Sequence, residues 1–441
     1  MTHEATTRVT TDNDAPAVPE TQQVLSATLG LVLAQTLGAF NDNFFKIVVS
    51  LFAVSASGAS GGGALSAISA IFILPFLLFS GYAGHVSDAY SKRAVLVTTK
   101  VLEILTMAVG LFALVFGQFW LMLVVLFLLA LEATFFSPAK YGILPELVAV
   151  RSLSRANGLL EMGSFLAIIL GTSLGSILFA IWKDRLGWIG ALTIVLALLG
   201  TLASLRIPVV PAARAHHALQ LSPFAEIALG LRRLRGDRTL WTTVIGISYF
   251  WFLGALMQMN ILLFGKEIMG LDDLRVGLLS AFIAIGIGTG SFAAGRLSGE
   301  KIELGLVPLG AIGMGVFSLI LAYAASSYVV VAVTLAALGF SGGLFIVPLN
   351  ASLQQKSGHE EKGRLLATNN FLNTIGILLA SGVLWLFRDI LQIHADTIAL
   401  IFGVLTLGVT VYLLRTLPDF FVRLRLWLCC DLRLVRLWQR R

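Results

Sequence analysis

Apolar stretches of about 20 residues follow one another along almost the whole sequence. A helix of this length is what a chain needs to cross the hydrocarbon core of a bilayer, which is about 30 Å thick. Only 12% of the 441 residues are charged, against about 25% in soluble proteins, so the chain could not cover a water-facing surface. We therefore predict an all-α membrane protein with about twelve spanning helices. The stretches are residues 24–54, 64–86, 94–116, 118–140, 156–181, 188–206, 239–265, 274–296, 305–325, 327–350, 365–388 and 395–417.

The positively charged residues are distributed unevenly among the connections. The segments on the side of the membrane where the N-terminus lies hold 24 Lys and Arg, counting the residues that flank each helix. The connections on the opposite side of the membrane hold 5. Because cytoplasmic loops carry the excess of positive charge, we predict that both chain ends are cytoplasmic. These loops account for the net charge of +7, so nucleic acid is not predicted as a partner.

The longest connection divides the chain into two halves of about six helices each. We predict a disordered cytoplasmic tail over 1–23, an N-terminal half over 24–206 and a C-terminal half over 239–417. The connection itself, 207–238, contains an amphipathic stretch rich in arginine, which is typical of a segment lying on an anionic leaflet. The end, 418–441, combines arginines with tryptophans and is predicted to be a basic amphipathic cytoplasmic tail.

Short matches relate the two halves. Leu37–Ala39 in the first predicted helix reappears as Leu253–Ala255 in the seventh, and Ser66-Ala67 in the second as Ser280-Ala281 in the eighth. The openings of the fifth and eleventh helices match at nearly the same offset. Two parallel six-helix halves around a central cavity are the arrangement of the major facilitator fold, which we therefore predict.

The connection after the second predicted helix carries Gly84 and Asp88, followed by Lys92 and Arg93. Major facilitators have a similar G-x-x-x-D pattern with trailing basic residues at this place, and it is associated with closure of the cytoplasmic side. Ala89 replaces the basic residue that usually follows the aspartate, so the match is partial. The resemblance implies a cytoplasmic latch at these four residues; the alternative is a polar turn with ordinary cytoplasmic charges.

Ionisable residues within the predicted helices are confined to the first half. Each costs at least about 2.5–3.5 kcal/mol at the bilayer centre, so each is a candidate functional group. They are Asp42, Lys46, Lys100, Glu103, Glu132, Lys140 and Glu161. Lys100 and Glu103 are three residues apart and are predicted to neutralise each other, and Lys46 is predicted to extend toward the outer interface.

The remaining charged residues are candidate substrate ligands. Asp42 lies between Asn41 and Asn43 in mid-helix, where local pairing accounts less well for its charge, and we predict a site at these three residues. Lys140 is near the predicted inner end of its helix and is either a topogenic charge or a head-group ligand. For the two glutamates, structural ion pairs and a place in the cavity remain equal alternatives.

In the repeat, neutral amides of the second half occupy the positions that correspond to these charged residues of the first half. By offset, Gln258 corresponds to Asp42, Asn350 to Lys140 and Asn373 to Glu161, and Asn370 lies beside the last of these. We predict a cavity with one charged wall and one apolar wall that carries amides. Such a cavity suits an amphiphile, with its ionic head on the first half and its hydrocarbon chain along the second.

No nucleotide-binding loop and no cluster with metal-ligand spacing occurs in the sequence. We therefore predict no catalytic residue, no cofactor and no metal site.

Several segments together resemble the lysophospholipid transporters of Gram-negative inner membranes, a branch of the major facilitator superfamily. The likeness covers residues 24–417 and is most specific in Ser137–Leu147. The segments are Gly38–Asn43, Ser137–Leu147, Ala156–Leu159 with Glu161, Gly342–Asn350 and Gln354-Gln355.

This resemblance implies movement of lysophospholipids such as lysophosphatidylethanolamine and lysophosphatidylglycerol toward the cytoplasmic leaflet of the inner membrane, where an acyltransferase restores the diacyl lipid. It also implies that Asp42 and Lys140 handle the head group. Related transporters tend to have an arginine in the seventh helix where this sequence has Gln258. The basic tail resembles the linker of relatives fused to an acyltransferase, and because the sequence ends there, we expect such a partner in trans.

Two other functions are compatible with the residues. A proton-coupled exporter of hydrophobic drugs would use Asp42 or Glu132 as its protonated group. A membrane partner of an acyltransferase would transport nothing and would not need the charges inside the helices.

Overall fold

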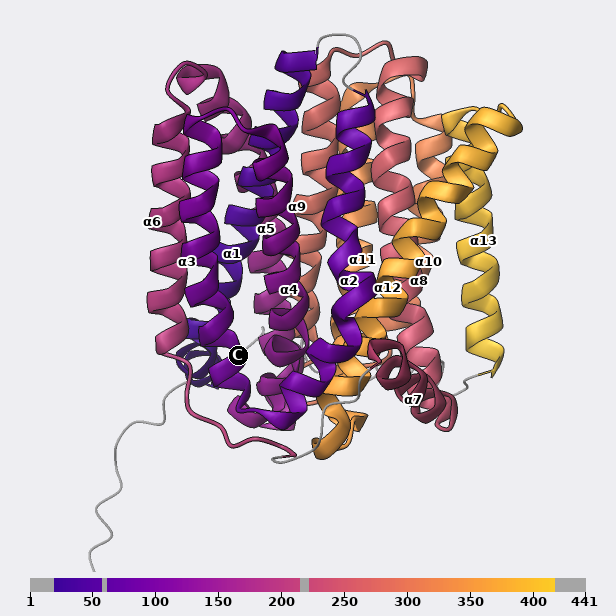
Figure 1. Ribbon diagram of the computed structural model, residues 1–441. Coiled ribbons are helices and arrows are strands. Elements are labelled where there is room, and N and C mark those ends of the chain that lie inside the picture. Colours follow the sequence, from indigo (N-terminus) through magenta and orange to yellow (C-terminus); the bar gives the residue numbers. More distant parts are fainter. Residues whose placement is uncertain (1–19, 58–61, 215–221, 417–441) are drawn as a thin grey trace, which may run out of the picture.

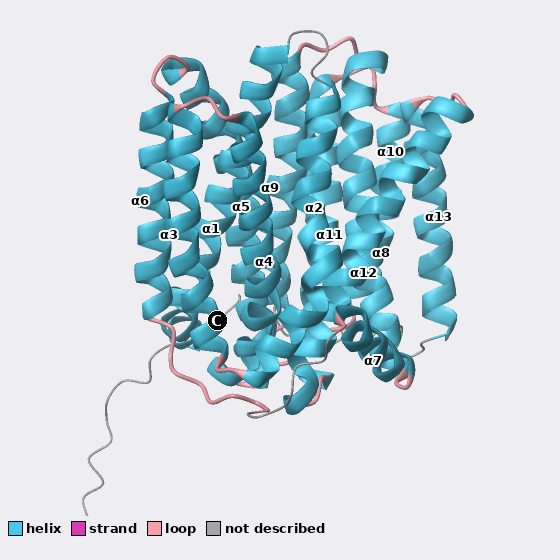
Figure 2. Cartoon of the chain, viewed as in Figure 1, coloured by secondary structure: helices cyan, strands magenta, loops and turns pink. Residues whose placement is uncertain are grey.

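The computed structural model describes residues 20–57, 62–214 and 222–416, which form a bundle of long helices with one short helix at one end (Figure 1). Figure 2 shows no β-strand within these ranges, so the all-α prediction is confirmed. The helices are α1 (Glu20–Ser57), α2 (Gly62–Ala89), α3 (Lys92–Val115), α4 (Phe119–Leu147), α5 (Leu153–Trp182), α6 (Leu186–Leu205), α7 (Pro223–Arg235), α8 (Arg238–Leu263), α9 (Asp273–Leu297), α10 (Leu306–Tyr323), α11 (Tyr328–Lys356), α12 (Lys362–Trp385) and α13 (Ala395–Thr416).

The long helices fit the predicted spans. Eleven of them are long and apolar enough to cross a membrane, and the described part of α13 adds a shorter apolar stretch. Helices are required here because a bilayer offers no water to pair with backbone N–H and C=O groups. α4 and α11 continue past the predicted ends at 140 and 350 to Leu147 and Lys356. The tail 418–441 and almost all of 1–23 lie outside the described residues.

The short helix α7 lies in the connection between the halves. Pro223 occupies its first turn, where a missing N–H is harmless. α7 packs against α2 and α12 and buries Glu226, Ile227 and Leu234, so its apolar face lies on the bundle and not on a lipid leaflet. We call the end of the bundle that carries α7 the linker end, and the opposite end the far end (Figure 1).

The two halves have different cores. The second half packs around one continuous cluster of buried apolar side chains. The first half has two clusters, one toward the linker end around Leu31, Leu96 and Ile143, and one toward the far end around Phe44 and Met107. Four charged residues of α1, α3 and α4 lie between these two clusters, so the core of the first half is interrupted at mid-depth. They are Asp42, Lys100, Glu103 and Glu132.

Glycines allow α9 and α11 to pack closely. A Cβ atom at Gly290 would overlap the backbone oxygen of Phe340, and one at Gly339 would overlap the backbone oxygen of Ile283. Small residues at such a crossing let two membrane helices approach through their backbones. This contact therefore depends on glycine at both positions.

We expect Gly290→Ala to lower the free energy of unfolding by about 1–3 kcal/mol, because the added methyl group has no space against α11. Gly277→Ala is the matched control on the same helix, since a Cβ there meets nothing within 4 Å. Thermal denaturation of the purified protein in detergent measures both. Equal denaturation temperatures for the two variants would contradict this account of the helix crossing.

Candidate functional site

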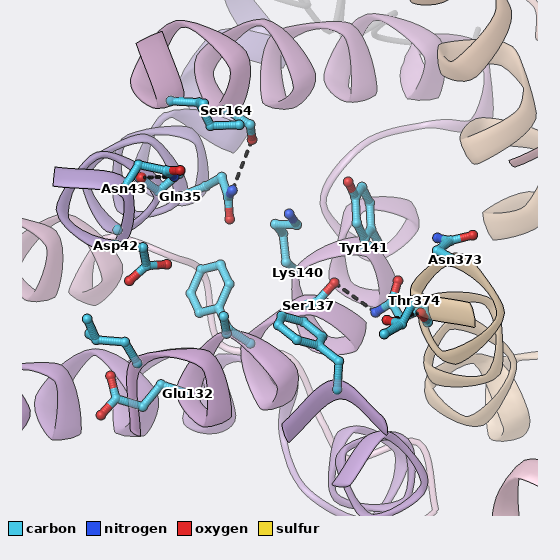
Figure 3. A pocket seen from close by; sticks show the side chains of 18 of the residues that line it. Gln35, Asp42, Asn43, Glu132, Ser137, Lys140, Tyr141, Ser164, Asn373 and Thr374 are labelled. Atoms are coloured by element: carbon cyan, nitrogen blue, oxygen red, sulfur yellow. Dashed lines mark hydrogen bonds between the residues drawn. The ribbon is translucent and has the colours of Figure 1, made fainter. Parts of the chain in front are cut away.

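A cavity of about 350 Å³ lies between the two halves. Its walls come from α1 to α5 of the first half and from α8, α11 and α12 of the second half. Figure 3 shows many of its side chains, with Asp42 and Glu132 at the left, Lys140 near the middle and Asn373 and Thr374 at the right. We call it the central cavity.

All the acidic and basic side chains that line the described central cavity come from the first half. They are Asp42, Lys100, Glu103, Glu132, Lys140 and Glu161. The second half contributes apolar side chains, a threonine and four amides, Asn350, Asn369, Asn370 and Asn373. The predicted contrast of charge is therefore present. The apolar lining is not confined to the second half as expected, because α2 supplies Phe72 and Phe76 and α4 supplies Phe136.

Lys100 and Glu103 form the predicted ion pair, with Nζ and Oε2 2.5 Å apart. Asn41 donates from Nδ2 to the other carboxylate oxygen of Glu103 at 2.9 Å and to the backbone oxygen of Thr193 at 3.3 Å. Asn41 is thus behind the cavity wall in the described conformation, and its place in the substrate site stays a prediction. Its side chain is turned toward α3 and α6, the helices that carry Glu103 and Thr193.

Asp42 and Asn43 line the central cavity as predicted. The side chain of Asn43 donates to the backbone oxygen of Ala39 at 2.7 Å. Lys46, one turn beyond, lies outside the lining, with its Nζ 4.6 Å from the ring centre of Phe72. An aromatic face, not the outer interface, therefore accommodates this lysine.

Lys140, Tyr141 and Glu161 form a connected group on the cavity wall. The Nζ of Lys140 lies 4.3 Å from the ring centre of Tyr141, whose hydroxyl donates to Oε1 of Glu161 at 2.6 Å. Asn350 of the second half donates to the same oxygen at 3.1 Å. Because α4 continues to Leu147, Lys140 lies about two turns inside its helix, which favours a site role over a topogenic one.

Glu132 also lines the central cavity, and Thr106 donates to its Oε1 at 2.5 Å. Gln258, which corresponds to Asp42 in the repeat, is exposed and lies outside the lining in the described conformation, so its place in the substrate site stays a prediction. The cavity residue of α8 is Trp251, about two turns nearer the linker end. The offset between the halves does not show which part of α8 faces the cavity, because that depends on how α8 packs against its neighbours.

Two of the four predicted latch residues connect the halves. The carboxylate of Asp88 accepts hydrogen bonds from the backbone N–H groups of Gly363 at 2.6 Å and Arg364 at 2.9 Å. These are first-turn donors of α12, which have no partner within their own helix and carry partial positive charge. A Cβ at Gly84 would lie 2.8 Å from that of Ala367, so α2 and α12 touch closely here.

The described partners of the other two latch residues belong to the first half or to the connection that follows it, and their part in a latch stays a prediction. Lys92 is buried and pairs with Glu146 at 2.7 Å. Arg93 donates to the backbone oxygens of Ile207 at 2.7 Å and Leu205 at 3.1 Å, at the end of α6. A local motif does not show which of its basic side chains point across to the other half.

Further polar contacts close the linker end. Asn157 and Gln354 exchange two hydrogen bonds of 2.8 Å across the halves. Asn370 donates to Ser137 at 2.8 Å. Glu226 of α7 accepts from Arg364 at 2.7 Å, and its other oxygen lies 3.8 Å from Nδ1 of His85.

Sequence reasoning missed these contacts, together with Tyr141 and Trp251 in the cavity. Tyr141, Asn157 and Gln354 all lie in the segments that resemble the transporter family, which was the available signal. Their partners are distant in sequence, so no local pattern pairs them.

A family model of the major facilitator superfamily matches residues 24–381. The sequence is 30% identical over 360 residues to the lysophospholipid transporter LplT of Enterobacter sp. (strain 638), covering 80% of this chain and 87% of that protein. This protein belongs to the lysophospholipid transporter family of the major facilitator superfamily. The transporter LplT of Serratia proteamaculans (strain 568) is 28% identical to this major facilitator over 376 residues, covering 83% of this chain and 90% of that one.

Solved structures of other major facilitators share its fold. The human organic anion transporter MFSD10 superposes with a TM-score of 0.69 at 18% identity, covering 89% of this chain and 100% of the other. FucP in its outward conformation gives a TM-score of 0.69 at 17% identity, covering 92% and 99%. The predicted major facilitator fold is thus confirmed.

We expect Asp88→Ala to loosen the linker end of this major facilitator, because the first turn of α12 then loses its acceptors in the other half. Spin labels at Val150→Cys and Glu360→Cys, exposed on opposite halves at the linker end, report the separation by double electron–electron resonance once the two native cysteines are serine. The distances should become longer and broader. Arg93→Gln removes bonds within the first half only and should leave them unchanged, and an unchanged distribution in Asp88→Ala would contradict the latch.

Proposed function

We propose that this protein moves lysophospholipids across a bacterial inner membrane toward the cytoplasmic leaflet, with its linker end in the cytoplasm. The transporter names of its relatives support the substrate class. The excess of Lys and Arg at the linker end supports the orientation, with both chain ends cytoplasmic. The observation that carries the proposal is a central cavity whose charges all come from one half.

A lysophospholipid poses a specific physical problem. Its head group loses water on entering the bilayer, whereas each CH₂ of its chain prefers apolar surroundings by about 0.8 kcal/mol. Charged side chains on the first half replace water around the head. Phe72 and Phe76 of α2 and Ile377 of α12 supply apolar surface on the same cavity for the chain.

Some charged residues of the cavity already have an ion-pair partner, and others can bind a ligand. Lys100 is paired with Glu103, with Nζ and Oε2 2.5 Å apart. Lys140 faces the cavity over the ring of Tyr141 and is the proposed ligand of the phosphate, through a charge-assisted hydrogen bond. Asp42 and Glu132 are the proposed acceptors for donors on the head group, and Asn43, Asn370 and Asn373 complete the polar lining.

Transport then proceeds by rocking of the two halves, residues 24–206 and 239–417. With the linker end held by Asp88 and by the Asn157–Gln354 pair, the described conformation is closed on the side that we propose is cytoplasmic. Separation of these contacts opens the cavity to the cytoplasm. An acyltransferase on that side, acting in trans, consumes the delivered lipid.

We expect Lys140→Gln to lower the rate of lysophospholipid flipping in proteoliposomes roughly 10-fold or more, because a hydrogen bond to a charged phosphate contributes about 1.5–3 kcal/mol. Labelled lysophosphatidylethanolamine, added to the outer leaflet and extracted from the outside over time, gives the rate. Lys46→Gln is the matched control, since Lys46 is a lysine within a first-half helix but outside the cavity lining.

Flipping by the wild type no faster than in protein-free vesicles would overturn the proposal. Transport of hydrophobic dyes that depends on a proton gradient, without lysolipid flipping, would point to a drug exporter. Equal rates for Lys140→Gln and Lys46→Gln would remove Lys140 from the site while leaving the transport function intact.

A further inference from the structure

Two hydrogen-bonded rungs join α5 and α11 across the halves. Glu161 pairs with Asn350 at 3.1 Å, and Asn157 pairs with Gln354 through two bonds of 2.8 Å. The residues on each helix are four apart, so the rungs lie one turn above the other on facing sides of the two helices. The Asn157–Gln354 rung is nearer the linker end.

The two rungs differ in their exposure to the central cavity. Glu161 and Asn350 both line it, whereas Asn157 and Gln354 are fully buried and do not. Only the first rung can therefore be reached by a ligand. It is also the weaker connection, since a single hydrogen bond crosses between the halves there.

The Glu161 oxygen that accepts the hydrogen bond from Asn350 has no further lone pair for another donor. Oε1 of Glu161 accepts from the hydroxyl of Tyr141 as well as from Asn350, which fills both lone-pair positions of that oxygen. Asn350 donates as a neutral amide. An ammonium donor brings a full positive charge to the carboxylate, which a neutral amide does not, so it competes with Asn350 for Glu161.

Lys140 lies close enough to Glu161 that a head group bound to Lys140 would place its ammonium donor near Glu161. Its Nζ is 4.3 Å from the ring of Tyr141, and Tyr141 is hydrogen-bonded to Glu161. A phosphate held by Lys140 therefore places the rest of a small head group within reach of the first rung. The contact made by the ligand and the contact made between the halves then involve the same carboxylate.

We propose that Glu161 and Asn350 form a ligand-sensitive connection between the halves: a donor on the head group of a monoacyl phospholipid, held at Lys140, replaces Asn350 at Glu161 and thereby loosens the linker end. This inference rests on the proposed function, since it assumes a phospholipid head group in the central cavity. Glu161 and Asn350 act here as positioning residues that link occupancy of the site to separation of α5 and α11. The second rung, one turn away, is then the remaining bond between these helices.

The spin-labelled pair Val150→Cys and Glu360→Cys tests the proposal in nanodiscs. Lysophosphatidylethanolamine, which has an ammonium donor, should increase the long-distance population of the wild type about threefold to tenfold, the effect of one lost hydrogen bond. Lysophosphatidylcholine, whose trimethylated nitrogen has no N–H, should increase it much less. Equal responses to the two lipids would overturn the proposal.

Asn350→Leu should raise the long-distance population without any lipid and should no longer respond to lysophosphatidylethanolamine. Gln355→Leu is the matched control, because Gln355 is an amide of the same helix α11 that is exposed and lies outside the cavity lining. It should respond like the wild type. An Asn350→Leu variant with wild-type distances and response would refute the connection.

Flipping measured in parallel separates this inference from the proposed function. If the wild type flips lysophospholipid but its distances do not respond as described, the coupling through Glu161 is wrong and the transport function stands. If the wild type flips no lysophospholipid, both are wrong.

Discussion

Charge within the hydrocarbon of a bilayer is the constraint on which the rest of this structure depends. An ionisable side chain there costs at least about 2.5–3.5 kcal/mol unless a partner or water compensates it. Here six such side chains of the first half line one cavity between the halves, and most of them lie at the level where the apolar core of the first half is divided. The second half has no such interruption and packs as one core. A polar site inside the membrane and an asymmetric pair of halves follow from the same placement of charge.

The residues that satisfy these charges also hold the two halves together. Glu161 accepts a hydrogen bond from the second half, and Asp88 accepts two from the first turn of α12. A site and a closure that share groups are energetically linked, because a ligand can shift a conformational equilibrium only by contacts that differ between the states. In the proposed mechanism, rocking of the halves and recognition of a head group therefore both involve the hydrogen bond between Glu161 and Asn350.

The fold could be predicted from the sequence because apolar length and the position of Lys and Arg are properties of each segment alone. The cavity position of Asp42 and Lys140 could also be predicted, since a charge inside a membrane helix is stable only where it faces a partner or a polar cavity. The surroundings of Asn41, Gln258 and Arg93 could not be predicted, because the face that a helix turns inward depends on how distant helices pack around it. Contacts between the halves likewise join residues far apart in sequence, and no local pattern specifies them.

The central claim is that the cavity between the halves binds a phospholipid with a single acyl chain. Native mass spectrometry of the purified protein, with the lipids that remain bound after extensive delipidation, tests it most directly. The account predicts retained monoacyl phospholipids, strongly enriched over their share of the source membrane, and their loss in a variant with Lys140 replaced by glutamine. Retained lipids that are diacyl and in the proportions of the source membrane, unaffected by that replacement, would contradict it.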